Sequence, residues 1–205
     1  EIERERGITV FSKEARFETG GKEFTLLDTP GHTDFSSETE RTLQVLDYAV
    51  LVVSGADGVQ AHTVTLWKLF RHYGIPVFVF VNKMDRPCAE RQDIIRELSE
   101  QLGGGVFADF DGAGSAGVTG SAGSADGGGR GKERCDFDRR NAEEIAGASE
   151  VLMEEYLETG TFCEESIRLA IEKRELFPVF FGSALKLEGV EEFIEALGRF
   201  TVGKE

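Results

Sequence analysis

Short apolar runs of strand length alternate along the chain with segments whose apolar residues recur at helical spacing. Runs of four to eight β-branched and aromatic residues are typical of strands buried in a parallel sheet. This pattern predicts strands at Ile8–Phe17, Glu23–Asp28, Ala49–Ser54, Pro76–Asn82 and Phe177–Ser183. Helical periodicity predicts helices at Ser36–Leu46, Gln60–Tyr73, Ala89–Leu102, Asn141–Glu158, Glu164–Leu176 and Val190–Phe200. We therefore expect an α/β fold, a doubly wound and mainly parallel sheet flanked by helices.

One segment breaks the pattern. Gly103–Gly131 is a Gly/Ala/Ser tract that holds 12 of the 25 glycines of the chain. Such a tract buries too little apolar surface to offset its ordering entropy. We expect a flexible insert over 103–140 that divides the domain into residues 1–102 and residues 141–205.

Composition narrows the class of protein. With 23 basic and 38 acidic residues, the net charge is −15, which disfavours binding to bare nucleic acid and predicts no sequence-specific DNA binding. No apolar run approaches the roughly 20 residues of a membrane span, so no membrane partner is expected. Cys88, Cys135 and Cys163 form no CxxC pair, which favours a cytoplasmic protein without a zinc site or disulfide framework.

A polar motif follows the strand predicted at Glu23–Asp28. Ligands of parallel sheets bind at the carboxyl ends of the strands, where Asp28-Thr29-Pro30-Gly31-His32 stands. An aspartate there suits Mg²⁺, a glycine offers an unhindered N–H, and a histidine can orient a water molecule. By itself, the motif fits a strand-to-helix turn equally well.

Two further strand ends carry polar residues. Asn82-Lys83-Met84-Asp85 suits guanine, because one carboxylate can accept from both N1–H and the exocyclic amine of that base. The alternative is a polar loop that caps the next helix. Gly182-Ser183-Ala184 could complete a base pocket with backbone N–H groups, although alone it favours a plain turn.

The motifs together resemble a known family. "RERGIT" (Arg4–Thr9), "LLDTPGHTDF", "GVQAHT" (Gly58–Thr63), "VNKMDR" (Val81–Arg86) and "GSALKLEGV" (Gly182–Val190) look like the G domain of translational GTPases. The similarity is greatest to the elongation factor G group, which includes the ribosomal protection proteins of tetracycline resistance; peptide chain release factor 3 is similar but less close. It implies a P-loop GTPase G domain, a cytoplasmic and monomeric translation factor with the ribosome as partner, and GTP and Mg²⁺ as ligands.

The resemblance also implies residue roles. Thr9 would bind Mg²⁺ and sense the γ-phosphate, Asp28 would hold Mg²⁺ through water, the Gly31 amide would contact the γ-phosphate, and His32 would orient the attacking water. Thr9, Gly31 and His32 would thus be the catalytic residues. The nucleotide would be bound by Asp28, Thr29, Pro30, Gly31, His32, Asn82, Lys83, Asp85, Ser183 and Ala184.

One part of the family pattern is missing. The sequence contains no GxxxxGK[ST] phosphate loop, and it begins at Glu1 without a methionine. We expect the first strand and the phosphate loop to be absent and the chain to be a fragment of a GTPase. A degenerate GTPase that serves as a ribosome- or protein-binding module is the main alternative. An acidic scaffold protein would explain the charge but none of the motifs, and the choice between translocation and tetracycline protection stays open.

Overall fold

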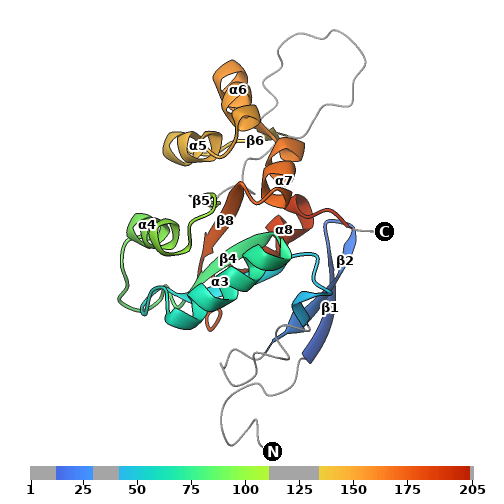
Figure 1. Cartoon of the computed structure of the whole chain (residues 1–205), viewed down its shortest axis with the longest axis vertical. Helices are drawn as coiled ribbons and strands as arrows, with labels where there is room; N and C mark the ends of the chain where they lie inside the picture. The colour runs from blue at the N-terminus through green and yellow to red at the C-terminus, as the bar shows by residue number, and fades with distance from the viewer. Residues whose placement is uncertain (1–12, 30–41, 111–133, 204–205) are drawn as a thin grey trace, which may run out of the picture.

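The structure is a computed structural model that describes residues 13–29, 42–110 and 134–203. Its centre is a four-stranded parallel sheet in the order β3-β4-β8-β5, and two short antiparallel pairs, β1-β2 and β6-β7, stand outside it (Figure 1). The strands are β1 Lys13–Thr19, β2 Lys22–Asp28, β3 Ala49–Ser54, β4 Val77–Asn82, β5 Val106–Asp109, β6 Arg134–Cys135, β7 Phe162–Cys163 and β8 Leu176–Phe181. The helices are α3 Ala61–Tyr73, α4 Arg91–Leu102, α5 Arg139–Ala146, α6 Glu150–Thr159, α7 Glu164–Glu172 and α8 Val190–Phe200.

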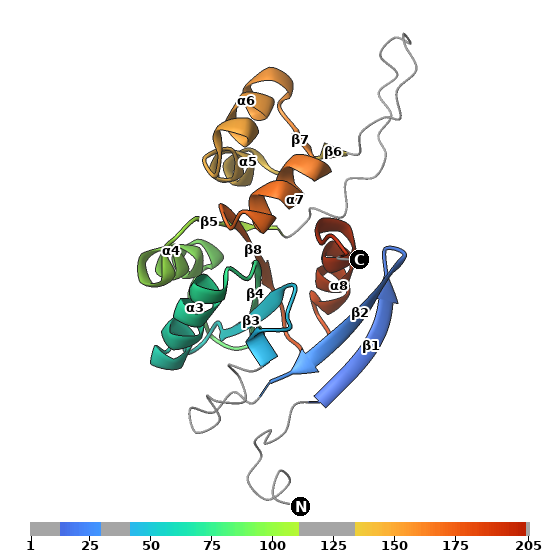
Figure 2. The same ribbon diagram turned by 45° about the vertical axis from the view of Figure 1, so that its right-hand side comes forward.

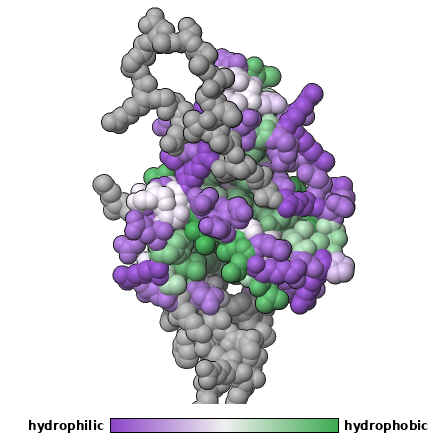
Figure 3. All heavy atoms as spheres, turned by 180° about the vertical axis from the view of Figure 1, so that it is seen from behind, coloured by the Kyte–Doolittle hydropathy of each residue, from purple (hydrophilic) through white to green (hydrophobic). Residues whose placement is uncertain are grey.

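Both faces of the central sheet are covered by helices. Alternate residues of β4 point to opposite faces, so that Val77, Val79 and Val81 pack with α3 and α4, whereas Phe78 and Phe80 pack with α7 and α8. Figure 2 shows these two layers, with α5 and α6 beyond α7. On the face seen in Figure 3, hydrophilic side chains surround a smaller group of hydrophobic ones. The expected α/β fold with a doubly wound parallel sheet is confirmed.

The segment that ends at Asp28 differs from the prediction. We expected a strand buried on both faces of the parallel sheet, but β2 pairs antiparallel with β1 in a separate hairpin. None of its residues is fully buried, and Leu26 is 48% exposed. The reason is that only one face of the hairpin packs on the protein, through Phe24, which stacks on Phe17 with ring centroids 5.2 Å apart.

The prediction for the Gly-rich segment also needs correction. Val106–Asp109, inside the range 103–140 that was interpreted as an insert, is strand β5 at the edge of the sheet. Phe107 and Ala108 are buried, because β5 pairs in parallel with β8. The boundary at residue 103 is therefore wrong, while residues 111–133 lie outside the described part of the chain.

Two helix predictions change as well. The single helix expected at Asn141–Glu158 is split into α5 and α6, because Gly147 ends the first and the Ser149 hydroxyl caps the second by accepting from the Leu152 N–H at 3.3 Å. The helix expected to reach Leu176 ends at Glu172, since Arg174 adopts a φ of 62° and turns the chain into β8. The helix expected at Ser36–Leu46 lies mostly outside the described residues.

The hairpin tip is attached to α8. Lys22 Nζ donates to the carbonyl oxygens of Gly198 at 2.7 Å and Thr201 at 2.6 Å, at the end of that helix. Burial lowers the pKa of Lys22. A Cβ placed on Gly20 would lie 2.9 Å from the Gly198 carbonyl oxygen, so the backbones of the hairpin and the helix leave no room for a side chain at this position.

This contact can be tested with two adjacent glycines. Gly20 and Gly21 have φ values of 58° and 70°, so an alanine strains either backbone by about 1–2 kcal/mol. Only at Gly20 would the new methyl group also meet α8, since nothing lies within 4 Å of a Cβ on Gly21. Gly20→Ala should therefore lower the free energy of unfolding by about 1–3 kcal/mol more than Gly21→Ala. Urea unfolding followed by the fluorescence of Trp67 measures both; equal losses would show that the contact does not stabilise the domain.

Candidate guanine-nucleotide site

Three parallel strands end at one edge of the sheet. In the ladders, Ser54 of β3 lies opposite Asn82 of β4, and Val81 lies opposite Phe181 of β8. The loops that follow are joined by backbone hydrogen bonds, from the Gly55 N–H to the Asn82 carbonyl at 2.8 Å and from the Met84 N–H to the Gly182 carbonyl at 3.0 Å. The loops after β3, β4 and β8 therefore form one surface.

The side chain of Asn82 holds two of these loops together. Its Oδ1 accepts from the Lys83 N–H at 2.7 Å and from the Ala184 N–H at 2.9 Å. The first bond shapes the turn after β4, and the second ties that turn to the loop after β8. Because both bonds use the oxygen, the amide NH₂ group remains to donate to a ligand.

Lys83 leaves this turn toward the loop after β3. It has a φ of 66°, a value that few residues other than glycine adopt. Its Nζ lies 3.5 Å from Asp57 Oδ2, and the same oxygen accepts from the Ser54 hydroxyl at 2.7 Å. The Ser54 hydroxyl first, and then the Lys83 charge, lower the pKa of Asp57, so this carboxylate is charged at neutral pH and orients the lysine.

Asp57 was not among the residues that the sequence singled out. A signal was available, because it is an acid in the loop directly after a predicted strand and directly before the "GVQAHT" motif. Asp57 was missed because a single acid in a turn is common and carries no spacing of its own.

Asp85 points the other way, toward the loop after β8. The Ser183 hydroxyl is the main cause that lowers the pKa of this exposed carboxyl. The Ser183 side chain is buried, and among the described residues its hydroxyl oxygen has no partner that meets the geometry of a hydrogen bond. An exposed carboxylate beside an unsatisfied buried hydroxyl fits a ligand that brings hydrogen-bond donors, as the N1–H and amine edge of guanine does.

The backbone amides expected to complete the base pocket already have partners. The Ser183 N–H donates to the Glu188 carbonyl at 3.0 Å, and the Ala184 N–H donates to Asn82. The Gly182-Ser183-Ala184 turn is nevertheless more specific than the sequence indicated. A Cβ on Gly182 would lie 2.2 Å from the Glu188 carbonyl oxygen, so only glycine fits there.

The structure brings together only part of the predicted site. Asn82, Lys83, Asp85, Ser183 and Ala184 share the carboxyl edge of the sheet. Asp28 and Thr29 stand at the end of β2, in the separate hairpin. Thr9, Pro30, Gly31 and His32 lie outside the described residues.

The described ranges show neither a cluster of metal-binding side chains nor a membrane-spanning helix. Residues 13–29, 42–110 and 134–203 contain no group of three or more His, Cys, Asp or Glu side chains that could hold a metal ion. The predicted Mg²⁺ ligands Thr9 and Asp28 thus remain a prediction. Within the same ranges, no helix is long and apolar enough to cross a membrane.

The fold first defines a class of protein: an α/β domain whose parallel sheet carries polar residues at the carboxyl ends of its strands, where the ligands of such sheets bind. Comparison with known proteins then gives the family. Residues 1–201 match the model of the elongation factor Tu GTP-binding domain, and the chain belongs to this family of translational GTPase domains.

The chain is also similar to curated relatives that are peptide chain release factors. The chain is 39% identical over 218 residues to peptide chain release factor 3 of Streptococcus mutans, and 40% identical over 217 residues to that of Streptococcus uberis. Each alignment covers 98% of this chain but only 40% of the relative, so the chain spans two fifths of the relatives' length. The finer resemblance to elongation factor G and the tetracycline protection proteins is not confirmed by these relatives.

A solved structure supports the fold alone. A protein of Thermus thermophilus superimposes with a TM-score of 0.73 at 23% sequence identity. The superposition covers 96% of this chain and 33% of that protein. The likeness therefore extends to almost the whole chain.

Substitution can test whether the Asn82 side-chain oxygen holds the two loops together. Asn82→Ala removes the acceptor of both loop-joining bonds and should lower the free energy of unfolding by about 1–3 kcal/mol. Asn82→Asp keeps an acceptor oxygen at the same place and should be distinctly more stable than the alanine variant. Urea unfolding of the two variants measures the difference. Equal losses would mean that the Asn82 oxygen does not hold the loops.

Proposed function

We propose that the chain is part of the G domain of a cytoplasmic translation factor that, as a full-length protein with its phosphate loop, binds and hydrolyses GTP on the ribosome. The observation that carries the proposal is the arrangement around Asn82, with Lys83 on the β3 side and Asp85 on the β8 side. Membership in the translational GTPase family supports both the nucleotide and the ribosome as partner. The similarity to release factor 3 favours a release factor over elongation factor G or a tetracycline protection protein.

Three residues of this edge each have a role in guanine recognition. Asp85 accepts from N1–H and the exocyclic amine, the Asn82 NH₂ group donates to the acceptor edge of the ring, and the Lys83 side chain lies along its face. Adenine would leave the Asp85 carboxylate opposite an acceptor, and such a mismatch is costly. The site therefore selects GTP over ATP by hydrogen-bond donors rather than by size.

The hydrolytic half rests on Asp28 and on residues that precede and follow the hairpin in the sequence. We assign Mg²⁺ binding to Thr9 and Asp28, the γ-phosphate contact to Gly31, and the orientation of the attacking water to His32. A bound Mg²⁺ would neutralise the charge that develops on the phosphate oxygens. Phosphoryl transfer needs little covalent chemistry from the protein, so the work of these residues is to position the reactants and stabilise charge.

The open edge of the sheet supports a missing first strand. In the described part of the chain, β3 pairs with β4 on one side and with no strand on the other. Val52 of β3 is 58% exposed, although the other strands of the sheet bury their apolar side chains well. A strand added at this edge would satisfy its free backbone groups. We propose that this strand leads into the phosphate loop that the 205 residues lack.

A second candidate function follows from the absence of the phosphate loop. Without a GxxxxGK[ST] loop, the chain could serve as a degenerate GTPase that binds the ribosome or another protein and hydrolyses nothing. The two functions differ in one measurable property, because only the enzyme needs to hold the phosphates of GTP.

Calorimetric titration of Mg²⁺–GTP, with Mg²⁺–ATP as control, separates the candidates. It should be made on the 205-residue chain and on the same chain extended by whatever its gene encodes upstream of Glu1. We expect selective binding of GTP at micromolar order in the extended protein and none in the shorter chain. An extended protein that contains a phosphate loop but binds neither nucleotide would refute the GTPase function.

Substituting Asp85 tests the base-recognition role directly. Asp85→Asn replaces an acceptor by an amide that can donate to the 2-oxo group of xanthine, so the preferred nucleotide should change from GTP to xanthosine triphosphate. We expect GTP affinity to fall by about 100-fold or more, as when a polar group of a site loses its partner. Competition binding on the extended protein measures both nucleotides, with Asp57→Asn as the control that leaves the carboxylate of Asp85 in place. Unchanged selectivity for GTP in the Asp85→Asn variant would remove Asp85 from the site.

A further inference from the structure

Helix α3 differs in charge from the other helices in the described part of the chain. It contains no aspartate or glutamate, whereas each of the others carries at least one acid. Lys68 and Arg71, three residues apart within the helix, are exposed on its solvent side, while Trp67 and Phe70 are buried in the core. In a chain with a net charge of −15, a helix whose exposed side carries only positive charge is unexpected.

A third cation, Arg174, lies against the end of α3. It stands two residues before β8, and its Nη1 donates to the Arg71 carbonyl oxygen at 3.2 Å. The Arg71 side chain lies beside Gly104, two residues before β5, because a Cβ placed there would be 3.5 Å from the guanidinium carbon. We call Lys68, Arg71 and Arg174 the basic patch.

The basic patch has no acidic partner within the described residues. Its three side chains take part in no ion pair there, although most other described arginines do. Those that pair with a carboxylate are Arg16, Arg91, Arg96, Arg134, Arg139, Arg140, Arg168 and Arg199. Burial first, and then the charge of Arg71, lower the pKa of Arg174. The patch therefore holds positive charge at a cost that a bound anion would offset.

The end of α3 accounts for one of these cations but not for three. The carbonyl groups in the last turn of a helix attract positive charge, and the bond from Arg174 to the Arg71 carbonyl uses this attraction. The Arg71 guanidinium donates to no group of the described residues, and Lys68 lies one turn earlier. Both side chains thus keep their donors for a group outside the domain.

The position of the basic patch keeps it clear of the strand that we propose to be missing. That strand would pair with β3 at one edge of the sheet, whereas Gly104 and Arg174 precede β5 and β8, toward the opposite edge. The patch also lies at the amino ends of the parallel strands, while a phosphate loop belongs at their carboxyl ends. A strand and loop added at β3 would therefore leave the patch exposed.

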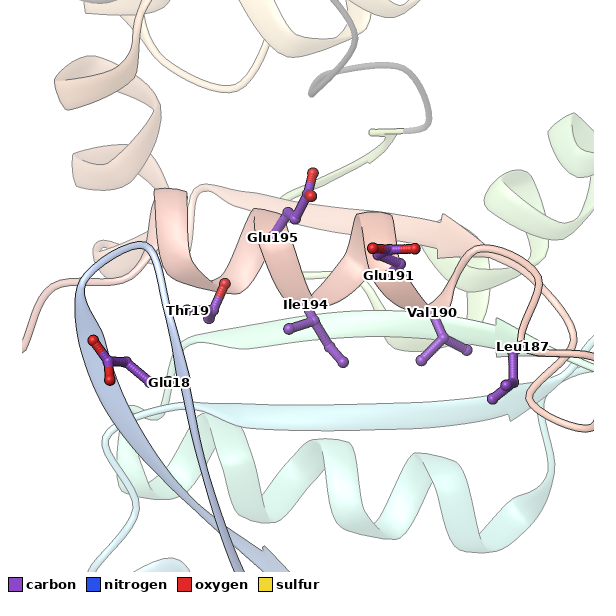
Figure 4. A pocket seen from close by; sticks show the side chains of 7 residues that line it. All are labelled: Glu18, Thr19, Leu187, Val190, Glu191, Ile194 and Glu195. Carbon is purple, nitrogen blue, oxygen red and sulfur yellow. The ribbon is translucent and has the colours of Figure 1, made fainter.

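An acidic surface lies on the opposite face of the sheet. Glu18, Glu191 and Glu195 line a groove between the hairpin and α8 (Figure 4). Helix α8 packs on the face of β4 formed by Phe78 and Phe80, and α3 packs on the other face. An anionic polymer would be repelled on the α8 side and attracted on the α3 side.

We propose that the basic patch binds the phosphate backbone of RNA, with Lys68 and Arg71 each contacting a phosphate group and Arg174 adding its charge. The inference rests on the proposed function, because a factor that acts on the ribosome meets RNA. The planar fork of an arginine matches two phosphate oxygens, and contacts to the backbone alone read no base sequence. A second copy of this chain, with a net charge of −15, has no comparable row of phosphates to offer.

A labelled RNA tests the basic patch. The probe is a fluorescein-labelled RNA duplex of about 16 base pairs, followed by fluorescence anisotropy. We expect the 205-residue chain to bind it with a dissociation constant on the order of 100 µM in about 50 mM salt. A polyglutamate peptide of the same net charge is the ligand control and should compete at least about fivefold less well. No binding of RNA, or equal competition by the peptide, would overturn the proposal.

Two double variants distinguish the basic patch from the charge of the whole chain. Lys68→Gln with Arg71→Gln should weaken RNA binding by about fivefold or more and reduce the salt dependence of log affinity by about 1.5 in slope. Arg139→Gln with Arg140→Gln removes the same charge from α5, where both arginines pair with glutamates, and should leave the affinity within about twofold. Equal weakening by the two double variants would overturn the proposal.

The extended protein separates this inference from the proposed GTPase function. Lys68 and Arg71 lie at the other end of the sheet from Asn82 and Asp85, so Lys68→Gln with Arg71→Gln should leave the binding of Mg²⁺–GTP unchanged. GTP binding together with RNA binding that ignores this variant would overturn the inference alone. RNA binding that depends on the patch, without GTP binding, would refute the GTPase alone. RNA binding that the 205-residue chain shows and the extended protein lacks would mean that the patch is covered, which would also overturn the inference.

Discussion

The candidate site depends on one acceptor, the side-chain oxygen of Asn82. In a parallel sheet, the ladder stops at the last paired residue, and nothing in its geometry ties the loops beyond it together. Asn82 stands at that last position opposite Ser54 and extends the hydrogen bonding by one layer, to the amides of Lys83 and Ala184. Lys83 and Asp85 are thereby presented on either side of it, toward the β3 loop and the β8 loop.

Local sequence patterns predicted the elements that are buried and regular. The strands at Ala49–Ser54 and near Val77–Asn82, and the helix at Val190–Phe200, lie where the apolar spacing placed them, because core packing and local propensity agree there. The polar motif Asn82–Asp85 lies at the end of a strand, as expected, for the same reason. Its residues are contiguous and follow directly a strand whose five apolar residues are all buried.

The pairing of strands could not be predicted from the sequence pattern. β5 has four residues and follows a Gly-Gly-Gly turn, so its strand character appears only when it pairs with β8, some 70 residues later. The hairpin was misassigned because a short apolar run does not say which strand it pairs with. Asp57 was missed since its partner, Lys83, is brought to it by the register of β3 and β4. For β5 and Asp57 the deciding contact joins residues distant along the chain, whereas for the hairpin it is the local pairing of β2 with β1.

The domain is anchored at two separate places, and this separation has consequences for function. The loops that suit guanine are held by Asn82 and by backbone bonds within the parallel sheet, and none of these bonds involves the hairpin. The hairpin is held at its tip, by Lys22 and by the close approach of Gly20 to Gly198. Its opposite ends continue into the segments that contain Thr9 and His32. The residues proposed to recognise the base therefore lie on loops of the parallel sheet, whereas Asp28, to which Mg²⁺ binding is assigned, belongs to a hairpin whose tip is held against α8.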